Sequence, residues 1–148
     1  MSKEPMGRVI AIANDHAGTA LKQALIPVLR AAGHDVLNLG TDTGDSVDYP
    51  DYGKRIAEAV ARGEAAFGIA ICGSGVGISM AANRIAGARC ALCGTAEIAG
   101  LARQHNDANI LALGARFLSE AEAIEILNAF LTTGFEGGRH AARVEKLG

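Results

Sequence analysis

Five short apolar segments, separated by enough residues for a helix between each pair, most constrain the fold of this chain. They are Val9–Ala13, Asp35–Leu39, Phe67–Cys72, Ala88–Cys93 and Asn109–Leu113. Parallel strands need a crossover connection, usually a helix, whereas antiparallel strands can be joined by a tight turn. The alternation therefore predicts a single open α/β domain with a five-stranded, mostly parallel sheet.

The spacers between these segments carry apolar stripes with helical periodicity. The first stripe is formed by Leu21, Leu25, Val28, Leu29 and Ala32. Gly33 follows it as a helix-ending signal, while Pro27 interrupts it and is expected to kink the helix or to mark an early turn. Similar stripes begin at Ile56, Ile78 and Ala123. We therefore expect a helix in each of these spacers.

The composition narrows the class of protein. The 148 residues can form one domain, 1–148, that buries a core without disulfides or metal, with residues 1–8 as a flexible leader. Hydrophobic residues make up 49% and aromatic residues only 4%, so the core must consist of aliphatic side chains, as in parallel sheets covered on both faces. The net charge of −2 gives no reason to expect nucleic acid as a partner. With three cysteines and only short apolar runs, we expect no disulfide framework, no secretion signal, no membrane partner and a cytoplasmic location.

Polar or reactive residues follow three of the predicted strands. They are Asn14-Asp15-His16, the segment Cys72–Gly77, and Gly114-Ala115-Arg116. In an open α/β sheet, ligands bind outside the carboxyl ends of the strands. We therefore expect these three segments to meet at one edge of the sheet and to form the functional site.

The segment Cys72–Gly77 is the most informative of the three. Glycines 73, 75 and 77 allow a tight turn with outward-facing N–H groups before an Ala-rich helix, which suits an anion or a developing oxyanion. A thiol beside that helix N-terminus, which carries roughly +0.5 charge, is expected to have a lowered pKa and to act as a base or nucleophile. The alternative, a tight turn with an inert buried cysteine, fits the motif equally well.

Several site types do not match the sequence. The glycine spacing differs from a dinucleotide-binding fingerprint, there is no P-loop, and Ser74 lacks the flanks of a serine hydrolase nucleophile. Cys90 and Cys93 should face opposite sides of a strand, with no second pair for zinc, so they are assigned to the core. We therefore predict no metal and no cofactor.

Three further polar groups are candidates, each with a structural alternative. Asp15 beside His16 could be a helix cap next to a solvated histidine, and His105-Asn106-Asp107 could be a helix stop. Arg139 and Arg143, four residues apart, would form a fork for phosphate if that segment is helical, or else a solvated basic end. Arg84, Arg89 and Arg103 are interpreted as surface charges.

Taken in order, five motifs resemble those of the type B ribose-5-phosphate isomerases. They are Asp15-His16-Ala17-Gly18, Asp48-Tyr49-Pro50, Cys72-Gly73-Ser74-Gly75-Val76-Gly77, Arg103-Gln104-His105-Asn106-Asp107 and Gly137-Gly138-Arg139-His140. The resemblance extends from Val9 to about Arg143 and includes relatives that act on allose and galactose 6-phosphates. One branch of the family has a Glu just past the glycines; Ile78 stands there, so this chain is similar to the cysteine branch.

The resemblance implies a Rossmann-like, three-layer α/β/α fold and a homodimer or tetramer with sites between subunits. It also implies interconversion of D-ribose 5-phosphate and D-ribulose 5-phosphate without metal or cofactor. Cys72 would move the proton between C1 and C2, and His105, with Asp15 nearby, would open the sugar ring. Ser74, Asn106 and the amides of the turn would hold the enediolate oxygens; the turn residues are Gly73, Gly75, Val76 and Gly77. The phosphate and sugar would be contacted by His16, Tyr49, Arg116, Arg139 and Arg143.

Other functions stay open at this point. The substrate could be another phosphosugar, such as an allose, galactose or tetrose phosphate. A non-catalytic phosphosugar or nucleotide sensor would need the anion-binding turn but not both Cys72 and His105. A redox or metal module built on the cysteines is disfavoured by their spacing.

Overall fold

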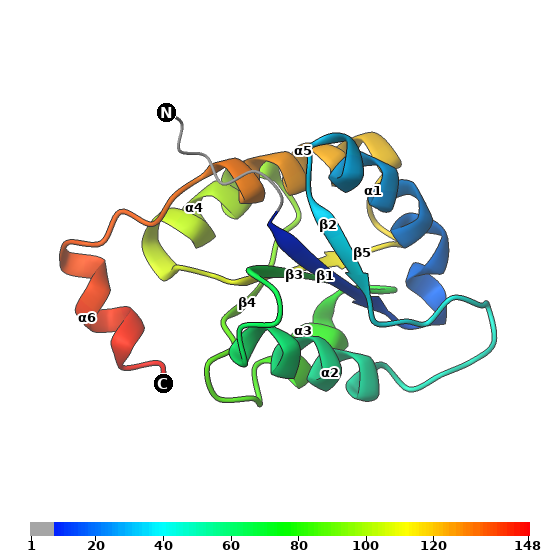
Figure 1. Cartoon of the computed structure of the whole chain (residues 1–148), viewed down its shortest axis with the longest axis horizontal. Helices are drawn as coiled ribbons and strands as arrows, with labels where there is room; N and C mark the ends of the chain where they lie inside the picture. The colour runs from blue at the N-terminus through cyan, green and yellow to red at the C-terminus, as the bar shows by residue number, and fades with distance from the viewer. Residues whose placement is uncertain (1–7) are drawn as a thin grey trace.

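The computed structural model describes residues 8–148, and within this range five strands form one sheet in the order β2-β1-β3-β5-β4 (Figure 1). The strands are β1 (Val9–Asn14), β2 (Asp35–Asn38), β3 (Phe67–Cys72), β4 (Cys90–Leu92) and β5 (Ile110–Gly114). The helices are α1 (Thr19–Ala31), α2 (Tyr49–Ala61), α3 (Val76–Ala82), α4 (Ala96–Asn106), α5 (Glu120–Thr132) and α6 (Arg139–Glu145), with a short 3-10 turn η1 (His16–Gly18). Each strand pair is parallel, which confirms the predicted α/β class.

The predicted strands agree with the structure to within two residues at every end, and β3 has the predicted bounds. The largest difference is at β4, which is three residues long instead of six. The side chain of Asn83 takes both backbone groups of Cys90: its Oδ1 accepts from the Cys90 N–H at 2.8 Å, and its Nδ2 donates to the Cys90 carbonyl at 2.9 Å. The Asn83 side chain thus takes the place of a neighbouring strand beside Cys90 on this edge strand.

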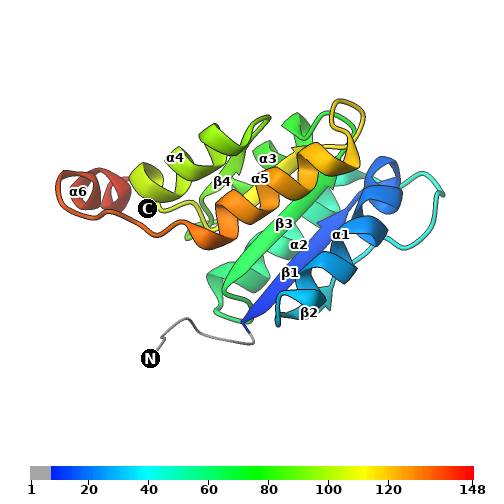
Figure 2. The same cartoon turned by 90° about the horizontal axis from the view of Figure 1, so that it is seen from above.

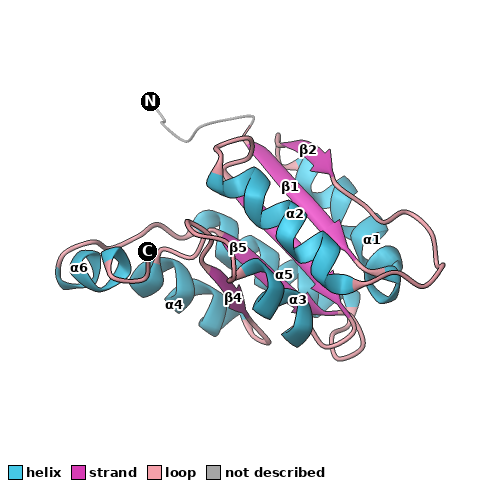
Figure 3. Cartoon of the chain, turned by 90° about the horizontal axis from the view of Figure 1, so that it is seen from below, coloured by secondary structure: helices cyan, strands magenta, loops and turns pink. Residues whose placement is uncertain are grey.

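Helices cover both faces of the sheet, as the aliphatic composition predicted. Figure 1 shows the sheet between two helical layers; Figure 2 shows α1 and α5 in front of it, and Figure 3, from the opposite side, shows α2 and α3 in front. Buried side chains of α1, α4 and α5 share one apolar cluster with the sheet, and those of α2 and α3 share the other. The fold is therefore a three-layer, Rossmann-like α/β/α structure.

The two faces of the central strands differ in side-chain size. Toward α1 and α5 they present Ile10, Ile12, Ile69 and Ile71. Toward α2 and α3 they present Ala11, Ala13 and Ala70, with Gly68 at the start of the row. A Cβ atom on Gly68 would lie 2.9 Å from Cδ1 of Ile56, so α2 packs very closely against this face. Cys72 ends the same row, and its side chain is therefore enclosed by the tightly packed layer.

Two local expectations can be compared with the structure. The helix α1 runs through Pro27 from Thr19 to Ala31, so no early turn interrupts it. Gly33 ends it as predicted: its φ is +93°, and the following His34 N–H donates to the carbonyl of Leu29 at 3.1 Å.

The proposed leader, residues 1–8, lies outside the described residues except for Arg8. The carbonyl of Arg8 accepts from the N–H of Asp35 at 3.0 Å, and its guanidinium lies 5.4 Å from the centre of the Phe67 ring. Arg8 thus contacts both the start of β2 and a ring of β3. None of the helices between residues 8 and 148 has the length and apolar character needed to cross a membrane.

The close contact between α2 and α3 can be tested at Gly53. A Cβ atom there would lie 2.8 Å from Cβ of Ala81 and 2.9 Å from the carbonyl oxygen of Ile78. We expect Gly53→Ala to lower the free energy of unfolding in urea by about 1–3 kcal/mol, because the two helices must move apart. Gly100→Ala in α4 is the matched control: a Cβ there meets nothing within 4 Å, so stability should rise by about 0.5–1 kcal/mol. Equal stability of the Gly53→Ala protein and the parent would contradict this packing.

Candidate functional site

The strand order reverses beside β1, because β2 lies on one side of it and β3 on the other. Such a reversal opens a crevice at the carboxyl ends of the two central strands, where the following loops diverge. The loop after β1 nevertheless stays attached to β3 at its base: the N–H of Asp15 donates to the carbonyl of Ile71 at 3.1 Å. A Cβ on Gly18 would lie 2.7 Å from Cγ2 of Ile71, so only glycine permits this contact. The structure thus brings together the first two predicted segments.

The turn after β3 surrounds the sulfur of Cys72. Cys72 is 4% exposed, and its Sγ accepts a hydrogen bond from the N–H of Gly75 at 3.2 Å. Gly75 adopts a left-handed φ of +79°, and a Cβ on it would lie 2.5 Å from Cδ1 of Leu92. The glycine thus lets the chain fold back and direct its amide at the thiol. A negative charge on this sulfur would be met by a backbone donor.

The same turn packs directly on the end of β5. A Cβ on Gly114 would lie 2.5 Å from the carbonyl oxygen of Ser74, and the N–H of Arg116 donates to the carbonyl of Gly73 at 2.9 Å. The guanidinium of Arg116 lies over Gly73, because a Cβ there would be 2.9 Å from its Nη1. The third predicted segment therefore meets the Cys72 turn, as expected from the strand ends.

Two amides of the turn do not face outward as predicted. The N–H of Gly75 donates to the Cys72 sulfur, and the N–H of Val76 donates to Oγ of Ser74 at 3.1 Å. The turn is so tight that the side chains of Cys72 and Ser74 accept hydrogen bonds from these two amides. In this structure these two amides orient Cys72 and Ser74, and the anion-binding role of Gly75 and Val76 stays a prediction.

Residues from the loop after β1 and from α2 complete this group. Asp15 caps η1, its Oδ1 accepting from the N–H of Ala17 at 2.9 Å, which is the structural alternative weighed from the sequence. Nδ1 of His16 accepts from the N–H of Val47 at 3.1 Å, so the ring carries its proton on Nε2 when neutral. Tyr49, the first residue of α2, lies against Gly77: a Cβ there would be 2.6 Å from Cε1 of the Tyr49 ring.

A buried lysine, not foreseen from the sequence, holds the segment that follows β2 and leads to the Cys72 group. Lys22 is only 1% exposed, and its Nζ donates to Oδ1 of Asn38 at 3.1 Å, to Oδ1 of Asp42 at 2.7 Å and to the carbonyl of Thr41. The hydrogen bond from Lys22, supported by one from Asn38, lowers the pKa of Asp42. A signal was available, because Lys22 precedes Leu25 by three residues and thus shares the buried stripe of α1.

Asn14 ties the same segment to the end of β1. Its Nδ2 donates to the carbonyl of Thr41 at 3.0 Å, to the carbonyl of Asp15 at 2.8 Å and to Oγ1 of Thr19 at 3.1 Å. Asn14 is fully buried, and its Oδ1 has no hydrogen-bond partner among the described residues. The Asn14 side chain therefore links the end of β1 to the start of α1 and to the segment after β2, which holds Asp15 and His16 in place.

The remaining predicted residues form a second group. His105 and Asn106 are the last two residues of α4, and Arg139 and Arg143 lie on α6, which is helical as their spacing required. They line a cavity of about 380 Å³ together with His140, Val144 and Leu147. The rings of His105 and His140 stack with 4.4 Å between centroids and 14° between planes.

Arg103, interpreted above as a surface charge, is buried and fixes the end of α4. It is 7% exposed; its Nε donates to the carbonyl of Thr133 at 3.1 Å, and its Nη1 donates to Oδ1 of Asp107 at 2.9 Å and to the carbonyl of Ala108 at 2.7 Å. The surface assignment is therefore wrong. Because Thr133 follows α5, this arginine joins the ends of α4 and α5 just before the chain enters α6.

The two groups lie at opposite edges of the sheet. Cys72 ends β3 and pairs with Gly114, whereas β5, which follows His105, begins at Ile110 opposite Gly68 near the start of β3. Cys72 lies four residues beyond Gly68 on β3, which is about 13 Å along the strand. Figure 2 shows α6 beside α4 at one end of the molecule, away from the loops after β1 and β3. A single copy of the chain therefore does not bring His105 to Cys72.

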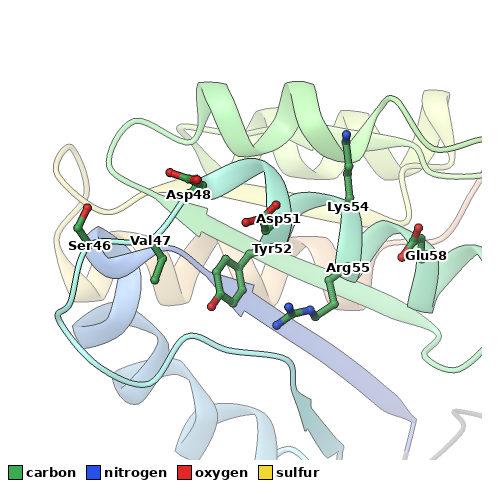
Figure 4. Close-up of a pocket in the computed structure, with 8 residues that line it drawn as sticks. All are labelled: Ser46, Val47, Asp48, Asp51, Tyr52, Lys54, Arg55 and Glu58. Carbon is green, nitrogen blue, oxygen red and sulfur yellow. The ribbon is translucent and has the colours of Figure 1, made fainter.

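Another groove, of about 570 Å³, runs along α2 and contains none of the predicted site residues (Figure 4). Its wall includes Tyr52 and Arg55, whose guanidinium lies 4.7 Å from the Tyr52 ring centre and donates to the carbonyl of Leu39 at 2.9 Å. The residues that line it are mainly solvated side chains on one face of α2. It adjoins the Cys72 group through Val47, whose N–H donates to His16, and through Asp48, which precedes Tyr49.

Cys90 and Cys93 pack on opposite faces of the sheet, as predicted. Burial, together with the neighbouring Cys93, raises the pKa of Cys90 to about 12, and burial raises the pKa of Cys93 to about 11. Both thiols therefore stay protonated at neutral pH, which does not suit a thiolate-based metal or redox site.

Comparison with known proteins identifies the family of this arrangement. Residues 10–147 match the family described as Ribose/Galactose Isomerase. The chain belongs to the ribose/galactose isomerase family. It is an enzyme of the isomerase class, and the resemblance found in its motifs is confirmed.

Individual members of the ribose/galactose isomerase family are similar over nearly the whole chain. Ribose-5-phosphate isomerase B of Escherichia coli K12 is 46% identical over 138 residues, covering 93% of each chain. The structure of the Clostridium thermocellum ribose-5-phosphate isomerase B has 48% identity and a TM-score of 0.93, covering 95% of both chains. That of the Mycoplasma genitalium enzyme, with bound ribulose-5-phosphate, has 41% identity and a TM-score of 0.92, covering 97% of this chain and 95% of that one.

The role of Lys22 in holding the site can be tested by Lys22→Met. Three acceptors would lose their charged donor, so we expect the free energy of unfolding to fall by about 1.5–3 kcal/mol in urea titrations. Lys54→Met removes an exposed lysine of α2 and should change stability by less than about 0.5 kcal/mol. A Lys22→Met protein as stable as the Lys54→Met control would show that this network is not needed.

Proposed function

We propose that this isomerase interconverts D-ribose 5-phosphate and D-ribulose 5-phosphate through an enediolate, without metal or cofactor, with Cys72 as the base. The observation that carries the proposal is the buried Cys72 sulfur, which accepts the Gly75 N–H at the carboxyl end of β3. The relatives that act on ribose 5-phosphate, one of them with bound ribulose-5-phosphate, support the choice of substrate.

In the proposed reaction the Cys72 thiolate removes the proton from C2 of the open-chain aldose. The electron pair of that C–H bond forms the enediolate, and the charge passes to the oxygen on C1. The proton of the C2 hydroxyl passes to the oxygen on C1. The enediolate double bond then takes the proton back from the thiol at C1, and the oxygen on C2 becomes the ketose carbonyl. A base correctly placed for such a proton transfer contributes roughly 10²- to 10⁴-fold to the rate.

The enediolate oxygens need donors that are in place before charge develops. We assign this task to Ser74 and the turn from Gly73 to Gly77, with Asn106 from the other group. The Ser74 hydroxyl is oriented by the Val76 N–H, which donates to it and leaves the hydroxyl proton free to point at the substrate.

Ring opening is assigned to His105, with Asp15 nearby, and it requires a second copy of the chain. Because His105 and Cys72 lie at opposite edges of one sheet, we propose a homodimer, or a tetramer built from it, in which each site combines Cys72 of one subunit with His105 of the other. One group then supplies the base and the other the ring-opening acid–base residue.

The phosphate is the remote group whose binding positions the reacting carbons. Arg139 and Arg143 line one cavity on α6, and His16, Tyr49 and Arg116 lie around the Cys72 turn. We assign the phosphate to the arginine pair and the sugar hydroxyls to the residues near Cys72.

The role of Cys72 is tested by Cys72→Ala, assayed with ribose 5-phosphate in the presence of EDTA. The kcat should fall by about 10²- to 10⁴-fold, because no other group would carry the proton, while binding of the phosphosugar measured by calorimetry stays near that of the parent. Exchange of substrate hydrogen with solvent should be lost as well. A variant that keeps most of its kcat would refute the assignment, and a parent that binds the sugar without turning it over would favour a non-catalytic sensor.

The division of the site between subunits predicts complementation. Cys72→Ala and His105→Asn should each be nearly inactive on cyclic ribose 5-phosphate. Unfolding and refolding them together in equal amounts should recover about a quarter of the parent activity, because half of the dimers are mixed and one of their two sites is intact.

A matched control uses two changes within one group. Mixing Cys72→Ala with Arg116→Ala should recover nothing, since every site then carries one of the two changes. Equal recovery in both mixtures, or none in either, would contradict a site that pairs Cys72 of one subunit with His105 of its partner.

A further inference from the structure

His105, Glu136 and His140 form a compact cluster beside the end of α4, and the proposed reaction gives a role only to His105. One ligand atom of each residue lies within 4.8 Å of the other two. Oε1 of Glu136 is 3.6 Å from Nε2 of His140 and 3.9 Å from Nε2 of His105. Figure 3 shows that α6, which carries His140, lies next to the end of α4.

We propose that this cluster binds a divalent transition-metal ion of the zinc type, and that the bound ion inhibits the isomerase by occupying His105. The binding stands on the cluster alone, whereas the inhibition rests on the proposed function of His105. Two imidazoles and one carboxylate are a common ligand set for zinc, with the fourth position left to water.

The geometry is close to that of a zinc site. Zinc binds nitrogen and oxygen ligands at about 2.0–2.2 Å, so ligand atoms in a tetrahedral site lie roughly 3.3 Å apart. The two separations to Oε1, 3.6 and 3.9 Å, exceed this by about half an ångström. The stacked rings must rotate apart to direct both lone pairs at one ion, and the half-exposed Glu136 carboxylate can follow them.

Backbone hydrogen bonds hold Glu136 and His140 beside His105. The N–H of Glu136 donates to the carbonyl of Gln104 at 3.0 Å, which fixes it beside the last turn of α4. The N–H of His140 donates to the carbonyl of Gly137 at 3.0 Å, at the start of α6. Metal binding would therefore begin from side chains that are already close together and would require their rotation.

Charge and ligand type decide which ions fit. Glu136 is the one carboxylate in the cluster, and Arg139 and Arg143 on α6 oppose a cation. Hard cations such as Mg²⁺, which need several oxygen ligands, should not bind, whereas imidazole ligands suit Zn²⁺, Co²⁺, Ni²⁺ and Cu²⁺.

The experiment titrates metal-free parent protein with Co²⁺ and follows its visible absorption. We expect one ion per chain, displaced by Zn²⁺, without the near-ultraviolet thiolate band that ligation by Cys72 would produce. Glu136→Gln and His140→Asn should each weaken Co²⁺ affinity by at least about tenfold. Glu145→Gln, which changes an exposed carboxylate on the same helix, is the control and should bind like the parent.

Inhibition is measured separately with ribose 5-phosphate. Without metal, Glu136→Gln should retain parent activity within about twofold, and Zn²⁺ should inhibit it at concentrations at least about tenfold higher than the parent, reversibly with EDTA. Absence of Co²⁺ binding, a thiolate band, or equal affinity in Glu136→Gln would overturn the site and leave the cluster as an ion pair. Binding without inhibition would overturn the regulatory role alone. A parent without isomerase activity would refute the proposed function but not the metal site, which the absorption tests independently.

Discussion

The contact between the turn after β3 and the end of β5 is the constraint on which the rest of the Cys72 group depends. The backbone of Ser74 comes so close to Gly114 that a Cβ there would lie 2.5 Å from its carbonyl oxygen. This contact allows the Arg116 N–H to reach the Gly73 carbonyl and places the guanidinium over Gly73. The same turn directs the Gly75 N–H at the Cys72 sulfur. Cys72, the turn that follows it and Arg116 are thus positioned by backbone packing, which is more rigid than a set of side-chain contacts.

The small-residue face of the sheet makes this packing possible. Alanine and glycine on β1 and β3 let α2 and α3 lie close, and Cys72 continues their row into the site. Tyr49 lies on Gly77 because α3 also begins with residues that leave room for its ring. The isoleucines of β1 and β3 lie on the opposite face, where α1 and α5 pack against them.

The division of the proposed site into two groups follows from the direction of the chain in an α/β fold. A crossover helix returns the chain to the amino edge of the sheet, so α4 must deliver its last residues, His105 and Asn106, away from the strand ends that hold Cys72. A second copy is the simplest way to bring such groups together. The buried Arg103 keeps the second group rigid by linking the ends of α4 and α5, and α6 extends from this junction with its two arginines.

The sequence by itself determined the class of fold, most element positions and the tight glycine turn after Cys72, because hydrophobic periodicity and glycine spacing are local signals. Only the tertiary structure decided that Lys22 and Arg103 are buried, since a long charged side chain is buried only where distant carbonyls and carboxylates converge on it. It also decided that Gly75 and Val76 donate within their own turn, and that Glu136, a loop residue with no distinguishing pattern, lies between two histidines. The tertiary structure also decided the separation of His105 from Cys72. Both residues lie in recognisable motifs, but the end of the sheet at which each one lies depends on the path of the whole chain.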